Sequence, residues 1–285
     1  MARPFRWSFE KREQLGSWID QAERFRRPHP EDLETLRVSA ARILAMSDGA
    51  DLAFIGRSPE NFYDYLCGCF SGLEGVPSLS LVPFSMRWEG EGGIAAIPAH
   101  KFSGLREALE ENGLSPARIA AADRPTALVD MIAYGGTMGA LVKILHRMAN
   151  EDGTDWNAVQ RRLKIIGLKV RTKNSPNTWR WQQHQNWLDL IPDAVIKNVS
   201  APAGFVFLIA NTDDKVTRSF HFGRWDKDET GAEPPSAEQL RAMKQAAWLY
   251  DLGKTREERH RLSRLIAKRP EMKQAATRAM VSALR

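Results

Sequence analysis

The feature that most constrains the fold is a series of short apolar runs separated by segments with helical spacing. DLAFI at 51–55 and TALVDMI at 126–132 are the clearest runs, and LKIIGLKV follows at 163–170. TALVDMI is apolar apart from Asp130, a pattern typical of a strand that is covered on both faces in a parallel sheet. Alternating strands and helices imply right-handed crossovers, so the sequence predicts an α/β fold built on a parallel sheet.

Weaker runs predict further strands, and helices are expected at both ends of the chain. The runs are LSLVPF at 79–84, GGIAAIP at 92–98, AVIKNV at 194–199 and FVFLIAN at 205–211. Helical spacing is found at 8–26, at 30–46 and through the last fifty residues. The sequence therefore predicts an N-terminal helical extension (1–49), an α/β domain (50–225) and a C-terminal helical segment (236–285).

Composition favours a soluble protein. The 285 residues are enough to bury a full core, and 43% of them are hydrophobic and 27% charged. No apolar run approaches the ~18–20 residues that a membrane span needs, and the first residues lack the apolar centre of a secretion signal. We expect a cytoplasmic protein without a membrane partner.

The two cysteines do not indicate a metal or disulfide site. Cys67 and Cys69 are separated by one residue in a segment of helical character. This spacing suits neither a zinc cluster nor a disulfide framework. We expect two buried thiols.

The positive charge of the chain is concentrated in its tail. Residues 236–285 hold 12 Lys and Arg against 5 Asp and Glu, a surplus of +7, whereas the whole chain carries +6. A solvated helical face would explain this surplus, and a contact with RNA or an anionic protein is the alternative.

A glycine-rich turn joins the central apolar run to the next helix. In VDMIAYGGTMGAL, residues 129–141, Gly135 and Gly136 lack a Cβ, so the backbone there can adopt positive φ and approach a ligand closely. The first amides of the helix would face the turn, where they favour an anion such as a phosphate. Thr137 could bond a phosphate oxygen or cap the helix. These residues alone fit a helix cap as well as an anion site.

The longer pattern LVDMIAYGGTM resembles the phosphoribosyl-pyrophosphate loop of the type I phosphoribosyltransferase superfamily. The resemblance implies that Asp130 contacts the ribose hydroxyls and is the catalytic candidate, although it could also simply cap a turn. It further implies a cradle for the 5′-phosphate of the sugar. The cradle would comprise Ala133, Tyr134, Gly135, Gly136, Thr137 and Met138.

A second loop supports this resemblance. In the family the first core strand ends in a loop that contacts pyrophosphate, and Gly56-Arg57-Ser58-Pro59-Glu60 follows DLAFI here. Arg57 could offer a forked donor to phosphate oxygens, with Ser58 beside it, or could form only a surface salt bridge. The two loops are about 75 residues apart, which fits strands that bring both to the carboxyl edge of one sheet.

Three positions depart from the family pattern. The family usually has two successive acids, but Val129 precedes Asp130; several members carry a carboxylate where Ala133 stands, and Tyr134 replaces a small hydroxyl residue. Magnesium is the cofactor that the resemblance implies, and these departures weaken the support for magnesium and pyrophosphate chemistry.

Several functions therefore stay open. The first is transfer of a phosphoribosyl group to a nitrogen nucleophile. The alternatives are a non-catalytic nucleotide sensor on the same fold and an RNA or protein-interaction module that uses the basic tail. A second copy of the chain, forming a homodimer, is a further candidate partner.

An aromatic segment lies between the central strands and the tail. Trp179, Trp181 and Trp187 lie near Arg180 and His184. Tryptophans can stack on a base, but we expect these to anchor the segment against the sheet. His184 has no metal-ligand partner three or four residues away, so a metal site is not expected there.

Overall fold

The computed structural model describes residues 20, 25, 27–86, 93–172, 180–226 and 235–285. Most of the predicted helix at 8–26 lies outside these residues, and Trp179 also lies outside them. The centre of the fold is a five-stranded sheet in the order β2-β1-β3-β4-β5, in which all neighbouring strands are parallel. The strands are β1 (Asp51–Ile55), β2 (Leu79–Val82), β3 (Thr126–Met131), β4 (Leu163–Val170) and β5 (Val195–Ala201).

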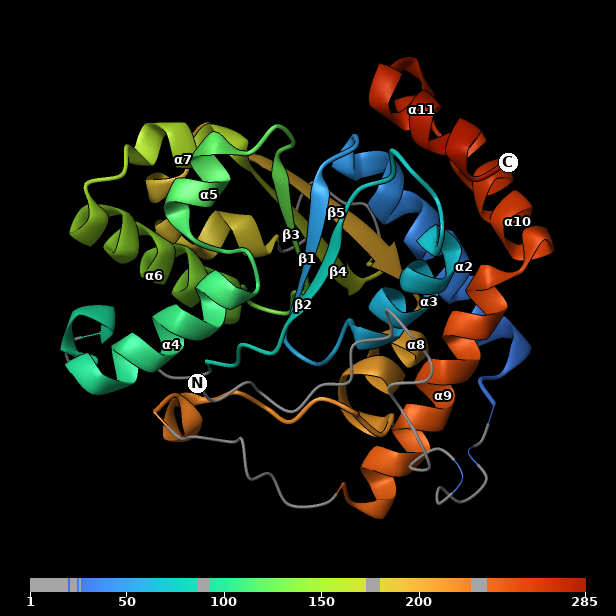
Figure 1. Cartoon of the computed structure of the whole chain (residues 1–285), viewed down its shortest axis with the longest axis horizontal. Helices are drawn as coiled ribbons and strands as arrows, with labels where there is room; N and C mark the ends of the chain where they lie inside the picture. Colours follow the sequence, from blue (N-terminus) through green and yellow to red (C-terminus); the bar gives the residue numbers. More distant parts are fainter. Residues whose placement is uncertain (1–19, 21–24, 26, 87–92, 173–179, 227–234) are drawn as a thin grey trace.

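Helices cover both faces of the sheet (Figure 1). One face is covered by α2 (Pro30–Ser47), α3 (Glu60–Phe70) and α8 (Ala203–Phe207). Outside these helices, α9 (Ala237–Lys254) packs on α3, α10 (Arg256–Ala267) packs on α2, and α11 (Ala275–Ala283) packs on α10. The other face is covered by α4 (Ala99–Glu111), α5 (Pro116–Ala121), α6 (Gly136–Asp152) and α7 (Trp156–Arg162). Short helices η2 (Gly93–Ala96), η3 (Trp181–His184) and η4 (Asn186–Leu190) join this second layer. The prediction of an α/β fold is confirmed.

The strands supply alternate residues to two cores. In β3, Ala127 and Val129 pack with the α2 layer, whereas Leu128 packs with the α6 layer. Successive side chains of a strand point to opposite faces. Because helices bury both faces of β3, its residues are almost all apolar. Asp130 is two residues after Leu128 in the strand, so its side chain points to the same face of the sheet, the one that α6 covers.

The terminal helices belong to the layer on the α2 face. Leu36 of α2, Leu249 of α9 and Leu262 of α10 are buried in one cluster with Phe54 of β1. The α9 N-terminus has a capping box, formed by Ser236 and Gln239. The bounds predicted for the three parts of the chain stay a prediction. Helices from all three parts contribute to this one core.

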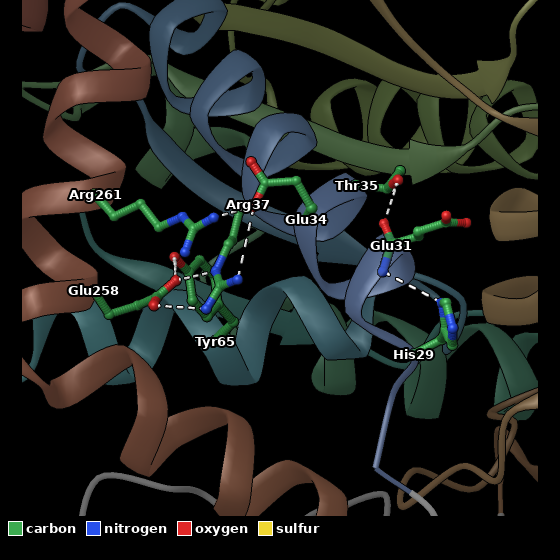
Figure 2. A network of polar contacts seen from close by, with 8 residues as sticks. All are labelled: His29, Glu31, Glu34, Thr35, Arg37, Tyr65, Glu258 and Arg261. Carbon is green, nitrogen blue, oxygen red and sulfur yellow. Dashed lines mark hydrogen bonds and ion pairs between the residues drawn. The ribbon is translucent and has the colours of Figure 1, made fainter.

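A buried ion pair connects three helices of this layer (Figure 2). Arg37 of α2 donates through Nε and through Nη2, at 2.8 Å, to the two carboxylate oxygens of Glu258 in α10. The Tyr65 hydroxyl of α3 donates to Glu258 Oε1 at 2.9 Å. At the rim, Glu34 accepts from Arg261 at 2.7 Å.

Two of the weaker strand predictions are wrong. The run at 92–98 contains the 3-10 helix η2, and the run at 205–211 forms the end of α8 followed by the π-helix η5 (Leu208–Thr212). Short apolar runs do not distinguish a strand from a buried helix. Pro202 begins a helix that continues through the second run and leads into the segment 213–217. Among the described residues, no helix has both the length and the apolar character that crossing a membrane requires.

Candidate functional site

The predicted site residues line one cavity at the carboxyl ends of β1 and β3. These two strands are neighbours, with Phe54 opposite Val129, and the chain leaves them toward opposite sides of the sheet. Open parallel sheets bind ligands at this kind of switch point. The cavity, called the β1–β3 cavity below, has a volume of about 590 Å³. It is lined by all predicted site residues, namely Arg57, Ser58, Asp130, Ala133, Tyr134, Gly135, Gly136, Thr137 and Met138.

The loop after β1 forms one wall of the cavity. The amide of Gly56 donates to the Val82 carbonyl at 2.7 Å, and the φ of +75° at Gly56 then turns the chain out of the strand. Glycine adopts this conformation without the steric cost that a Cβ would bring. The turn leaves Arg57 exposed and Ser58 half-buried at the cavity.

The loop after β3 forms the opposite wall and leads into α6. Gly135 has a φ of +85° and is the N-cap residue, and the Gly139 amide donates to its carbonyl at 2.9 Å. Helix geometry therefore leaves the amides of 136–138 without an intrahelical partner. A Cβ built on Gly136 would meet no atom within 4 Å, so this position is open. Tyr134 is 74% exposed at the rim.

Two tryptophans pack against this loop and the first turn of α6. A Cβ on Gly135 would lie 3.0 Å from Trp181, and one on Gly139 would lie 2.5 Å from Trp187. The two indoles stack with centroids 5.9 Å apart, and Trp181 Nε1 donates to Asn198 Oδ1 at 3.0 Å. Both rings are almost fully buried. The expectation that they anchor the segment is confirmed, and they are not available to stack on a base.

Asp130 is buried at the base of the cavity. Its Oδ1 accepts the Met131 amide at 2.6 Å, and the residue is 7% exposed. Burial raises the pKa of this carboxyl well above its usual range, and the Met131 amide opposes the shift without cancelling it. The neighbouring Val129 is fully buried in the core on the α2 face, so it contributes nothing to the cavity.

Comparison of the chain with protein-family models, curated proteins and solved structures found no match.

Lys215 also lines the cavity, and the sequence analysis missed it. It lies in the segment that follows η5, and its Nζ is buried without a hydrogen-bond partner among the described residues. Burial lowers its pKa, and the nearby Arg57 acts in the same direction. The local pattern DDKVTR offered no signal, because only the tertiary fold brings this lysine to β1 and β3.

A second cavity of about 460 Å³ adjoins the first, and we call it the side cavity. Both are lined by Arg57, Ala210 and Lys215. The side cavity is mainly polar and also involves Asp214 and Arg218. Arg57 and Lys215 therefore lie where the two cavities meet.

The residues of the β1–β3 cavity do not fit a resident magnesium ion. Mg²⁺ prefers anionic oxygen ligands, but Asp130 carries the one carboxylate among the described residues that line this cavity. Its raised pKa favours the protonated form, which is a poor metal ligand. No group of three or more His, Cys, Asp or Glu side chains suited to a metal occurs in the described part of the chain. Magnesium stays a prediction that the resemblance alone supports.

Proposed function

We propose that the β1–β3 cavity binds 5-phosphoribosyl pyrophosphate or a nucleotide that contains ribose 5-phosphate. The observation that carries the proposal is that two loops far apart in the sequence, together with Asp130, line a single cavity. The 5′-phosphate lies against the amides of 136–138, and the ribose hydroxyls lie at Asp130. The second phosphate or pyrophosphate lies near Arg57 and Ser58.

The electrostatics of the cavity suit such an anion. The α6 N-terminus carries partial positive charge and three amides without intrahelical partners. Arg57 and Lys215 add two cationic groups. A protonated Asp130 carboxyl would not repel phosphate, and it can both donate to and accept from ribose hydroxyls.

As an enzyme, the protein would transfer the phosphoribosyl group to a nitrogen nucleophile. The nitrogen forms a bond to ribose C1 as the bond from C1 to the pyrophosphate oxygen breaks, and pyrophosphate leaves with the electron pair. The nitrogen then loses its proton to solvent. Groups that neutralise the departing pyrophosphate stabilise this transition state.

The second candidate is a non-catalytic sensor of the same ligand. It is favoured by the position of Val129, which is buried in the core where the family usually has an acid, and by the lack of a side-chain carboxylate at Ala133. A sensor needs the phosphate cradle but no group to assist pyrophosphate departure. The two candidates differ in pyrophosphate release, which can be measured with the ligand and candidate bases.

Thermal unfolding in the presence of 5-phosphoribosyl pyrophosphate tests the binding proposal. The ligand should raise the Tm of the wild type but not that of Gly136→Val, whose added methyl groups project into open space at the cavity. Gly204→Val is the matched control, since Gly204 is also open but lies outside the cavity. Asp130→Ala should also lose the shift. Equal shifts in all four proteins would reject the site.

A further inference from the structure

We propose that Lys215 neutralises the second phosphate or pyrophosphate of the ligand, so that tight binding does not require magnesium. This inference rests on the proposed function and assigns a role that neither predicted loop supplies.

The position of Lys215 is the first argument. It lines both the β1–β3 cavity and the side cavity, as Arg57 does, whereas the residues at the α6 N-terminus line only the β1–β3 cavity. A ligand whose 5′-phosphate occupies the amides of 136–138 would direct its other charged end toward these two cations. The presence of two separate groups of anion-binding residues in the cavity lining therefore favours a sugar phosphorylated at two positions.

The second argument is that the ammonium group lacks a partner. Lys215 Nζ is buried and makes no hydrogen bond to any described residue. Burying a cation without hydrogen bonds is costly, and natural proteins usually pair such groups. A phosphate oxygen entering the cavity would supply the hydrogen bonds that this group lacks.

The third argument is that the backbone around Lys215 is fixed. Glu60, at the start of α3, accepts the Val216 amide at 3.0 Å and the Thr217 amide at 3.2 Å. Asn61 donates to Asp213 at 2.9 Å. These contacts hold the lysine from both sides before any ligand binds, which is the preorganisation that an anion site requires.

The charges that surround Lys215 are consistent with this role. Glu60, Asp213 and Asp64 favour its charged form, whereas Arg57 and burial oppose it. Both oxygens of Glu60 accept backbone amides, and Asp213 accepts from Asn61, so Glu60 and Asp213 are engaged by neutral donors. They support the ammonium charge without forming a hydrogen bond to it.

Isothermal titration with two ligands tests the assignment. Wild type, Lys215→Met and Lys215→Gln would be titrated with 5-phosphoribosyl pyrophosphate and with ribose 5-phosphate, each in EDTA and in magnesium. Wild type should bind both ligands in EDTA. Both variants should lose about tenfold to hundredfold in affinity for the pyrophosphate ligand, because a charged hydrogen-bond donor is removed. Their affinity for ribose 5-phosphate should change less than about threefold.

The outcomes separate this inference from the proposed function. If wild type binds ribose 5-phosphate but needs magnesium for the pyrophosphate ligand, the Lys215 role is rejected and the proposed function stands. Equal weakening of both ligands in the two variants would also reject it. Binding of neither ligand by wild type would reject the proposed function and this inference with it. Both variants should have a Tm close to that of wild type, since Lys215 Nζ makes no hydrogen bond to a described residue that the substitution would remove.

Discussion

At the scale of single residues, the two adjacent glycines of the β3 loop have different reasons to be glycine. Gly135 has a φ of +85°, and an added Cβ would lie 3.0 Å from Trp181, whereas Gly136 is in helical conformation and open. Gly135→Ala should therefore lower the free energy of unfolding by about 1–2 kcal/mol. Gly136→Ala should change it by less than about 0.5 kcal/mol. Urea denaturation measures both, and equal effects would contradict the loop geometry.

Asp130 makes stability depend on pH. Its folded-state pKa is raised by burial above the ordinary value, so its contribution to stability is fully present below that value and is lost as the pH rises through the raised pKa. Asp130→Asn cannot ionise, so it should be more stable than wild type at about pH 8, with the advantage shrinking toward about pH 4. Thermal unfolding across this range is the measurement. A constant difference would mean that Asp130 does not titrate as a buried acid.

Asp130 and the glycines could be predicted from sequence because their pattern is local. A strand, a turn with glycines and a helix are encoded within residues 126–141, so the wall of the cavity could be placed before the structure was known. Lys215 could not be predicted in this way. Its burial and its lack of a partner arise from segments that are distant in sequence, and no short motif records them.

At the scale of elements, the segment 213–217 depends on Glu60. The Glu60 carboxylate accepts two backbone amides from this segment, and removing it leaves both donors unsatisfied in a buried place. Glu60→Ala should lower the free energy of unfolding by about 2–4 kcal/mol and speed hydrogen exchange at 213–217. Glu60→Gln, which retains one acceptor oxygen, should cost less. Unchanged exchange in both variants would show that other contacts hold the segment.

The run just before this segment, at 205–211, shows where element prediction from sequence fails. FVFLIAN was predicted to be a strand because its residues are apolar and β-branched or aromatic, but Pro202 starts a helix there and Phe207 is 63% exposed. β3 formed as predicted although it has only six residues, because helices on both faces of the sheet bury it. Periodicity separates helix from strand only when enough residues are available to display it.

At the scale of the whole molecule, the buried Arg37–Glu258 pair joins the two ends of the chain through α2 and α10 (Figure 2). Arg37→Met would leave Glu258 as a buried charge without its cationic partner, so the free energy of unfolding should fall by about 3–5 kcal/mol. Arg261→Met is the matched control, because the Arg261–Glu34 pair is partly exposed and should contribute less than about 1 kcal/mol. Similar losses in the two variants would contradict this assignment.

The packing of the terminal helices also affects how the predicted RNA contact can be tested. Removing residues 236–285 would delete Leu249, Leu262 and Met280 from the core on the α2 face, so the truncated chain should not fold normally. Charge reversal at the exposed Arg264, Lys268 and Lys273 leaves the core intact. If the basic tail binds RNA, this variant should lose salt-dependent retention; unchanged retention would reject that reading.

The central claim is that the amides at the start of α6 hold a sugar phosphate, and amide NMR during titration with ribose 5-phosphate tests it most directly. We predict saturable shifts that are largest at Gly136, Thr137 and Met138, with no change at Gly153 at the other end of the same helix. Shifts confined to other regions, or no saturable shift at these three amides, would contradict the account.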